Sequence, residues 1–361
     1  IKKTLNRELS DWESDRSGLE QKLQTWYDLS ENIVEDAVLP FEGASFIHIP
    51  MTRIFLKIYN SIQNRSLLGT DNLWYAETDD KNTEQFVPMI ERYFNYRARV
   101  DWNVYEILTD CFRSANRDSV CVAQFDYDLE TDDKEDTILI TNSQEFLDEF
   151  GDPEQSGLDE QEWGDYFSKS QTANEEEPLE IPVSYENIQY YGPRGSVIEL
   201  IDFVLLPATA RDISKTNCHG YGKRFKMRNA EIRKKADEGL FYYDQAKKLF
   251  SSKKSNYEPS KGDQMRMYSQ GLAQTGENDE HELFEIVYWF DLEDNGQEVK
   301  LVFTYSKDKK ALLAVRYHIY RTNNFVIFYI DKKTNEFIGH CLPDDLMDLN
   351  DGVDAIVNQR I

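Results

Sequence analysis

The chain has 361 residues, of which 40% are hydrophobic and 13% aromatic, so it is long and apolar enough to form two or three folded units. Its formal net charge of −26 disfavours a protein that binds nucleic acid by neutralising phosphates with Lys and Arg. Four widely spaced cysteines without a CxxC pair, and the lack of a signal peptide or a long apolar run, favour a soluble protein of a reducing cytosol.

The first third of the chain is predicted to be mostly helical. Apolar residues at three-, four- and seven-residue steps indicate an amphipathic helix over residues 1–30. A second helix should begin near Pro50, after a tight turn that Gly43 permits. Helical spacing continues beyond it, with apolar positions at Ile54, Phe55, Ile58, Tyr59, Ile62, Phe86, Met89, Ile90, Tyr93, Phe94, Tyr105, Leu108 and Phe112.

The middle of the chain alternates between strand signals and acidic sequence. Residues 119–128 alternate and are rich in β-formers, so we expect a strand that pairs with residues 137–142 across an acidic loop. From Leu129 to Ile181, 18 Asp or Glu stand against two Lys, which predicts a solvated insertion with short helices such as residues 145–150. Strand character returns at residues 183–207, with a turn expected at Gly192-Pro193-Arg194-Gly195.

The last third is predicted to contain a basic helix, a β-rich part and a final helix. Residues 223–254 are basic and favour a helix, and residues 257–280 are polar enough for a linker or loop. Alternating residues on both sides of Asn295-Gly296 predict a β-hairpin over 284–305 with a type I′ turn, and two further strands follow. Pro343 should open a helix that reaches Ile361; because this apolar helix is uncapped, we expect the natural polypeptide to continue.

Motifs that could carry chemistry are weak in this sequence. Asp291, Glu293, Asn295 and Gly296 resemble the start of a calcium loop, but Val302 occupies the position of its bidentate Glu. The pairs Cys218-His219 and His340-Cys341 lack the spacing of a zinc module, and residues 219–224 lack that of a phosphate-binding loop. Without GxSxG or HExxH, the sequence predicts a protein that is not an enzyme and has no metal site or cofactor.

Three segments, in this order, resemble the portal proteins of tailed bacteriophages, particularly the larger portals of short-tailed phages. Residues 40–77 carry Gly-Ala-Ser, an apolar stretch, Pro50 and a long helix. Residues 197–234 are similar to the family's strand that ends in Pro and small residues before a basic helical stretch. Residues 335–361 are similar to the Gly-containing turn and Asn-Gln helix that return through the stem.

The resemblance implies an α+β subunit, with a portal-like wing of helices and a small β-sheet, an α-helical stem and a β-rich clip. Its copies would form a dodecameric ring at the unique capsid vertex of the virion, assembled in the host cytoplasm. The implied partners are the major capsid protein, the terminase motor, tail adaptor proteins and double-stranded DNA that passes without sequence specificity, with no membrane. The implied division is wing 1–222 with an acidic insertion 129–181, first stem helix 223–252, clip 253–336 and a truncated returning stem helix 337–361.

The acidic composition suits a channel through which DNA must slide. Carboxylates repel phosphates within a Debye length of roughly 8 Å, whereas a basic wall would bind the DNA. The basic stretch 223–254 could touch DNA phosphates or pair with acidic residues of a neighbouring subunit. We expect a mixture of the two, in which pairing between subunits is the larger part. The predicted interface or channel residues are Arg233, Lys234, Lys235, Lys247, Lys248, Asp344 and Asp345.

Two other functions remain open at this point. The many carboxylates could form a metal-dependent nuclease or another phage enzyme, since two-metal sites are built from clustered Asp and Glu. The hairpin 284–305 could instead be the partner surface of a monomeric binding module.

Overall fold

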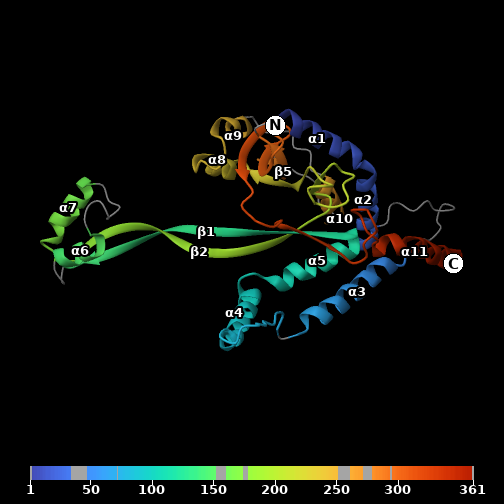
Figure 1. The fold of residues 1–361 in the computed structure, drawn as a ribbon, viewed down its shortest axis with the longest axis horizontal. Helices are drawn as coiled ribbons and strands as arrows, with labels where there is room; N and C mark the ends of the chain where they lie inside the picture. The colour runs from blue at the N-terminus through green and yellow to red at the C-terminus, as the bar shows by residue number, and fades with distance from the viewer. Residues whose placement is uncertain are drawn as a thin grey trace. The chain divides into compact units, whose positions relative to one another are not determined.

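The computed structural model describes residues 2–33, 47–70, 72–151, 160–173, 178–250, 261–270, 279–292 and 295–359 (Figure 1). Helices and sheets both contribute, so the predicted α+β class is confirmed. The chain divides into two units: unit 1 comprises Ile1–Phe125 and Gly195–Ile361, and unit 2 comprises Asp126–Arg194. This boundary lies inside the predicted wing and coincides with none of the predicted divisions at 222, 252 or 336.

Unit 1 contains a five-stranded antiparallel sheet in the order β3-β4-β5-β6-β7. β5 and β6 alternate apolar and polar residues, and Phe284 pairs with Tyr305 and Ile286 with Phe303, which places these four aromatic and β-branched side chains on one face. The strands are β3 (Phe203–Leu206), β4 (Gly220–Arg228), β5 (Glu280–Asp291), β6 (Glu298–Ser306) and β7 (Ala311–Tyr317).

The helices of unit 1 cover this sheet and extend beyond it. The amphipathic N-terminal helix packs Leu5, Leu9 and Trp12 against the aromatic face of β5 and β6, as its apolar spacing predicts. The described helices are α1 (Lys2–Asp15), α2 (Ser17–Glu31), α3 (Met51–Leu68), α4 (Val87–Val100), α5 (Val104–Asp118), α8 (Asn229–Asp237), α9 (Tyr243–Phe250), α10 (Lys261–Gln270) and α11 (Leu342–Gln359), and a 3-10 turn lies at Glu84–Phe86.

Arg16 breaks the predicted N-terminal helix into α1 and α2. Its guanidinium is buried and donates to the carbonyls of Phe203 and Leu200 at 3.2 and 3.1 Å, next to Glu20 and over the ring of Trp12. Burial lowers the pKa of Arg16 to about 10, and Glu20 partly opposes this. Arg16 therefore fixes both helices to the start of β3.

A second sheet has the order β2-β1-β8, in which β8 (Phe325–Tyr329) pairs antiparallel with the start of β1 (Val120–Ile140). On the unit 1 side, Gly195 of β2 (Leu179–Ile198) lies where an added Cβ would approach Phe125 within 2.7 Å and Ile107 within 2.9 Å. A larger residue at Gly195 would therefore require the Phe125 and Ile107 side chains to shift.

Unit 2 consists of the outer parts of β1 and β2 with α6 (Ser143–Phe150) and α7 (Glu160–Ser170). The predicted helix at residues 145–150 is confirmed, and Asn142 caps it by accepting from two backbone N–H groups. The predicted solvated insertion is wrong in one respect, because it has a hydrophobic core of its own. Buried Ile140, Phe146, Phe150 and Ile181 form that core, and Trp163, Tyr166 and Phe167 pack against it.

Two predictions about strands 119–142 and 183–207 are wrong. Residues 137–142 do not fold back on 119–128, because β1 continues through the acidic segment and takes β2 as its partner. The Gly192–Gly195 sequence is not a hairpin turn but lies within β2. Arg194 on β2 pairs with Asp128 and Glu130 on β1, which offsets part of the carboxylate repulsion along the strand pair.

The predicted first stem helix, 223–252, is also wrong. Residues 223–228 belong to β4, because Tyr221, Phe225 and Met227 alternate and pair with β5; two short helices, α8 and α9, follow. Gly239, with a φ of 75°, separates the two helices. The predicted linker 257–280 contains α10, whose Met265 is buried against the core.

The hairpin and the final helix are confirmed at β5, β6 and α11, and the helix predicted near Pro50 begins at Met51. In the turn of the hairpin, Gly296 has a positive φ of 80°, and the Asp291 carboxylate accepts from the backbone N–H groups of Asn295 and Gly296. The turn predicted at Gly43 lies outside the described residues.

Candidate subunit interface

The five predicted cations lie together on α8 and α9. Ile232, Ala236 and Leu249 bury one side of this helix pair against β4, β5 and β7, and the Tyr242 N–H donates to the Leu313 carbonyl at 2.7 Å. The opposite side presents the cations: Arg233, Lys234, Lys247 and Lys248 are exposed, and Lys235 is half-buried.

Local contacts of these cations are weak. Arg233 lies 5.1 Å from the ring centroid of Phe250, and Lys234 lies 3.8 Å from Glu238 with both side chains largely exposed. Lys248 donates to Gln245, and Lys235 lies over Phe241. The helix pair therefore presents a positive surface to solvent in an otherwise acidic chain.

Asp344 and Asp345 lie in the first turn of α11, where a carboxylate is favoured by the helix dipole. The Asp344 carboxylate accepts from the Trp26 indole N–H at 3.4 Å, and both aspartates are exposed. α11 packs against α2, α3 and α5, whereas α8 and α9 pack against β4 and β7. In the part of the chain that the structure describes, Asp344 and Asp345 form no hydrogen bond or ion pair with α8 or α9.

A row of polar residues on α11, which the sequence analysis missed, holds the start of α3. Asn350, Asp354 and Asn358 are four residues apart, so they share one face of the helix. Their side chains bind the backbone just before α3: Asn358 exchanges two hydrogen bonds with Ile47, and Asp354 accepts from the Ile49 N–H at 2.9 Å. Asn350 accepts from the Met51 N–H at 3.1 Å.

His48 completes this contact. Its Nδ1 lies 2.6 Å from the Asp354 carboxylate, which is 6% exposed. Because Asn350 and Asp354 are buried polar groups with partners, they specify the register between α11 and residues 47–51. Polar residues spaced by four within an apolar helix were the sequence signal for this contact.

α3 and α4 present apolar faces that no described residue covers. On α4 and at Phe86, which directly precedes it, exposed residues fall at steps of three and four, the seam pattern of a coiled coil. They are Phe86, Met89, Tyr93, Tyr96 and Val100, and they are 47–64% exposed. The face of α3 that the sequence predicted to be apolar is likewise exposed, with Ile54, Phe55, Ile58, Tyr59 and Ile62 at 43–60%. Apolar patches of this kind mark interaction surfaces.

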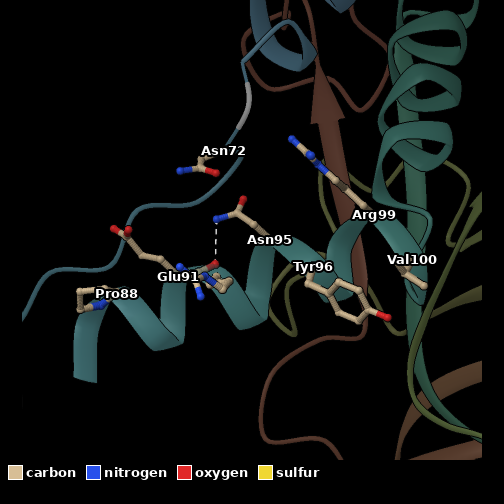
Figure 2. A pocket seen from close by; sticks show the side chains of 8 residues that line it. Asn72, Pro88, Glu91, Asn95, Tyr96, Arg99 and Val100 are labelled. Carbon is tan, nitrogen blue, oxygen red and sulfur yellow. Dashed lines mark hydrogen bonds between the residues drawn. The ribbon is translucent and has the colours of Figure 1, made fainter. Parts of the chain in front are cut away.

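Hydrogen bonds from α4 side chains attach this helix to the segment that precedes it. Figure 2 shows Pro88, Glu91, Asn95 and Tyr96 along α4, with Asn72 on the facing segment, around a cavity of about 440 Å³. The buried Asn95 amide accepts from the Leu73 N–H at 2.7 Å and donates to the Trp74 carbonyl at 2.9 Å. Its second donor bond goes to the Glu91 carbonyl on α4 itself.

Sites for catalysis or metal binding have little support in the described residues. Within those ranges, no three His, Cys, Asp or Glu side chains are grouped so that they could hold a metal ion. Asp291 of the calcium-like sequence caps its own turn, and Glu293 lies outside the described residues. Burial raises the pKa of both Cys218 and Cys341 to about 12, which disfavours the thiolate that binds zinc. Nor does any described helix combine the length and apolarity that crossing a bilayer requires.

Comparison with known proteins gives one family. A family model described as "Phage SU10 portal protein" matches residues 58–359, which is most of the chain. A search of curated proteins gives no match. The matched range includes α4, β1 to β8 and α11, so it contains all of unit 2 and the part of unit 1 from residue 58 to residue 359.

Proposed function

Because the chain belongs to the phage SU10 portal protein family, it is a structural protein of a bacteriophage portal, and we propose that its copies assemble into a dodecameric ring through which the genome is packaged and ejected. The ring occupies the unique capsid vertex of the virion and forms in the host cytoplasm. Its partners are the major capsid protein, the terminase motor and tail adaptor proteins, and double-stranded DNA passes through it without sequence specificity.

The exposed apolar faces of α3 and α4 carry the proposal that copies associate. Two different faces on one subunit suit a head-to-tail contact, in which α4 of one copy packs against α3 of the next. A head-to-tail contact closes into a ring when its rotation divides a full turn, as the portal role requires. Burying these side chains removes apolar surface from water at about 25 cal/mol per Å², which favours assembly.

Charge supports a conduit rather than a DNA-binding wall. With 67 acidic against 41 basic residues, each copy repels phosphate overall, so duplex DNA would slide past most of its surface. The exposed cations of α8 and α9 are proposed to pair with acidic residues of a neighbouring copy, as are Asp344 and Asp345 with basic ones.

The wing, stem and clip division stays a proposal with one change. α11 suits the returning stem helix proposed for 337–361, and β5 and β6 remain the hairpin of the proposed clip. The first stem helix is not proposed for 223–252, since these residues form a strand and two short helices.

Size measurements of the purified chain test the ring and its interface. Multi-angle light scattering should give a mass near twelve copies, and Tyr93→Asp on α4 or Ile58→Asp on α3 should shift it toward one copy, because each buries a charge in an apolar contact. Tyr317→Asp is the matched control, since Tyr317 is 66% exposed but lies at the end of β7. A wild-type chain that stays monomeric at all concentrations would contradict the proposal.

A further inference from the structure

A cavity of about 400 Å³ lies between α2, α3 and α5 in unit 1. Its volume is in the range of small-ligand sites, about 300–1,000 Å³. Four cations line it, Arg53, Lys57, Arg113 and Arg117, against one carboxylate, Glu31. Basic residues therefore outnumber acidic ones at the cavity, whereas acidic residues outnumber basic ones in the whole chain.

The spacing of the cations follows from two packed helices. Arg53 and Lys57 are four residues apart on α3, and Arg113 and Arg117 are four apart on α5, so each pair shares one helix face. α3 and α5 pack against each other, and the Asn116 amide of α5 donates to Asn60 and Gln63 of α3 at 2.7 and 2.6 Å. The two rows of cations are thus held at a fixed separation.

The cations differ in how far their charge is already balanced. Arg117 makes two hydrogen bonds to Asp118 at 2.7 and 2.6 Å, and Arg113 lies 3.3 Å from Asp110 with both side chains exposed. Within the described residues, neither Arg53 nor Lys57 forms an ion pair. Arg53 and Lys57 therefore supply the unbalanced positive charge at the cavity, which Glu31 offsets only in part.

The cavity also contains a buried acceptor without a partner. Oδ1 of Asn64, about two helical turns beyond Lys57 on α3, is buried and accepts no hydrogen bond from the described residues. A buried carbonyl oxygen without a donor destabilises the fold, so a ligand that brings a hydroxyl donor would recover this loss. An anion alone would not satisfy it.

We propose that this cavity binds the phosphate monoester group of a small hydroxyl-bearing molecule, such as a sugar phosphate. Arg53 and Lys57 donate charge-assisted hydrogen bonds to the phosphate oxygens, and Arg113 adds a third cation at the rim. A phosphate monoester carries about −1.5 to −2 charges at pH 7, which matches the excess of lining cations better than one carboxylate does. A ligand hydroxyl donates to Asn64. The inference does not depend on ring formation.

Calorimetric titration of the full chain in a phosphate-free buffer tests the proposal. Glucose 6-phosphate should bind more tightly than inorganic phosphate, and Lys57→Gln and Arg53→Gln should each weaken binding about tenfold or more, because each removes a charge-assisted hydrogen bond. Lys247→Gln on α9 is the matched control and should leave the affinity unchanged. Affinity should fall at high salt.

Other probes separate the possible sources of the anion. Equal affinity of wild type and Lys57→Gln, or no binding at millimolar ligand, would overturn the proposal. So would binding of only a short oligonucleotide or an acidic peptide, because either result would place the phosphodiester backbone or a carboxylate partner in the cavity instead. Ring formation, measured on the same samples, reports separately on the portal assembly.

Discussion

Units 1 and 2 differ most in how they balance charge. Unit 2 has 21 Asp or Glu against three Lys or Arg in 69 residues, a net charge of −18, whereas the much longer unit 1 carries the remaining −8. In unit 1, carboxylates are commonly paired: Arg224 bonds Asp202, and Arg266 bonds Glu199 and Asp263. In unit 2, cations are too few for most carboxylates to be paired.

Both units nevertheless contain hydrophobic cores. Apolar residues and charged residues therefore determine different properties of each unit. The spacing of apolar residues determines where a core forms. Phe146 and Phe150, four residues apart, form part of a core even in the most acidic part of the chain. Charge fixes what surrounds that core and how it responds to salt and pH. An acidic composition therefore indicates a surface with a strong field, and not the lack of a fold.

The largest expected effect is on the core of unit 1. Phe303 is fully buried between α1 and the sheet, so Phe303→Ala should lower the free energy of unfolding by about 3–5 kcal/mol. Chemical denaturation followed by tryptophan fluorescence measures this. A loss below about 1 kcal/mol would mean that this face of the sheet is not the core of the unit.

The same substitution in unit 2 tests whether the two units unfold separately. Phe146 is also fully buried, and Phe146→Ala should cost about 3 kcal/mol, at the lower end because the small core can collapse around the gap. In hydrogen-exchange measurements, the backbone amides of α6 and α7 should lose protection, whereas those of β4, β5 and β6 should keep it. Equal loss in both units would show that they unfold as one.

Salt should affect the two units differently. Raising sodium chloride from about 20 mM to 0.5 M screens the repulsion among unit 2 carboxylates, and should stabilise α6 and α7 by on the order of 1 kcal/mol. The exchange rates of β5 and β6 in unit 1 should change little. If both regions respond alike, the charge difference between the units does not govern their stability.

The smallest effect concerns one cation of unit 1. Lys300 lies over the rings of Tyr221 and Trp289 and donates to Asn323, and burial lowers its pKa to about 8. Between pH 8 and 10.5 the unfolded chain binds more protons at this side chain than the folded one, so stability rises with pH across this window. Below pH 8 the cost of burying the charge is fully present.

Lys300→Met removes this titration. Relative to wild type, the variant should be more stable at pH 7, and the difference should shrink as pH rises through 8 to 10.5. Thermal unfolding of both proteins at pH 7, 9 and 10.5 measures it. A difference that is constant with pH would mean that Lys300 keeps its ordinary pKa in the folded chain.

The sequence was sufficient where a local pattern decides the structure. The alternation at Phe284 and Phe303 predicted the hairpin, Pro50 and Pro343 marked two helix starts, and Leu5 to Trp12 predicted a packed amphipathic helix. It failed where a distant partner decides: β1 continues through Asp132 and Asp136, residues that disfavour strands, because β2 pairs with it.

The candidate interface shows the same limit. The basic residues of α8 and α9 were predicted from composition, but the single helix expected there was wrong, because pairing with β5 overrides the helix propensity of residues 223–228. The apolar residues of α3 and α4 were found as helix faces, yet only the structure reveals that they are exposed. The role of the row Asn350, Asp354 and Asn358 becomes visible only when the position of residues 47–51 is known. The four-residue spacing alone does not give that position.

Negative-stain imaging of the purified chain, beside Tyr93→Asp, tests the central claim most directly. Annular particles of about twelve copies are expected for the wild type and should be lost in the variant, whose circular dichroism should show that the fold is retained. Single small particles in the wild type, or intact rings in both Tyr93→Asp and Ile58→Asp, would contradict assembly through the apolar faces of α4 and α3.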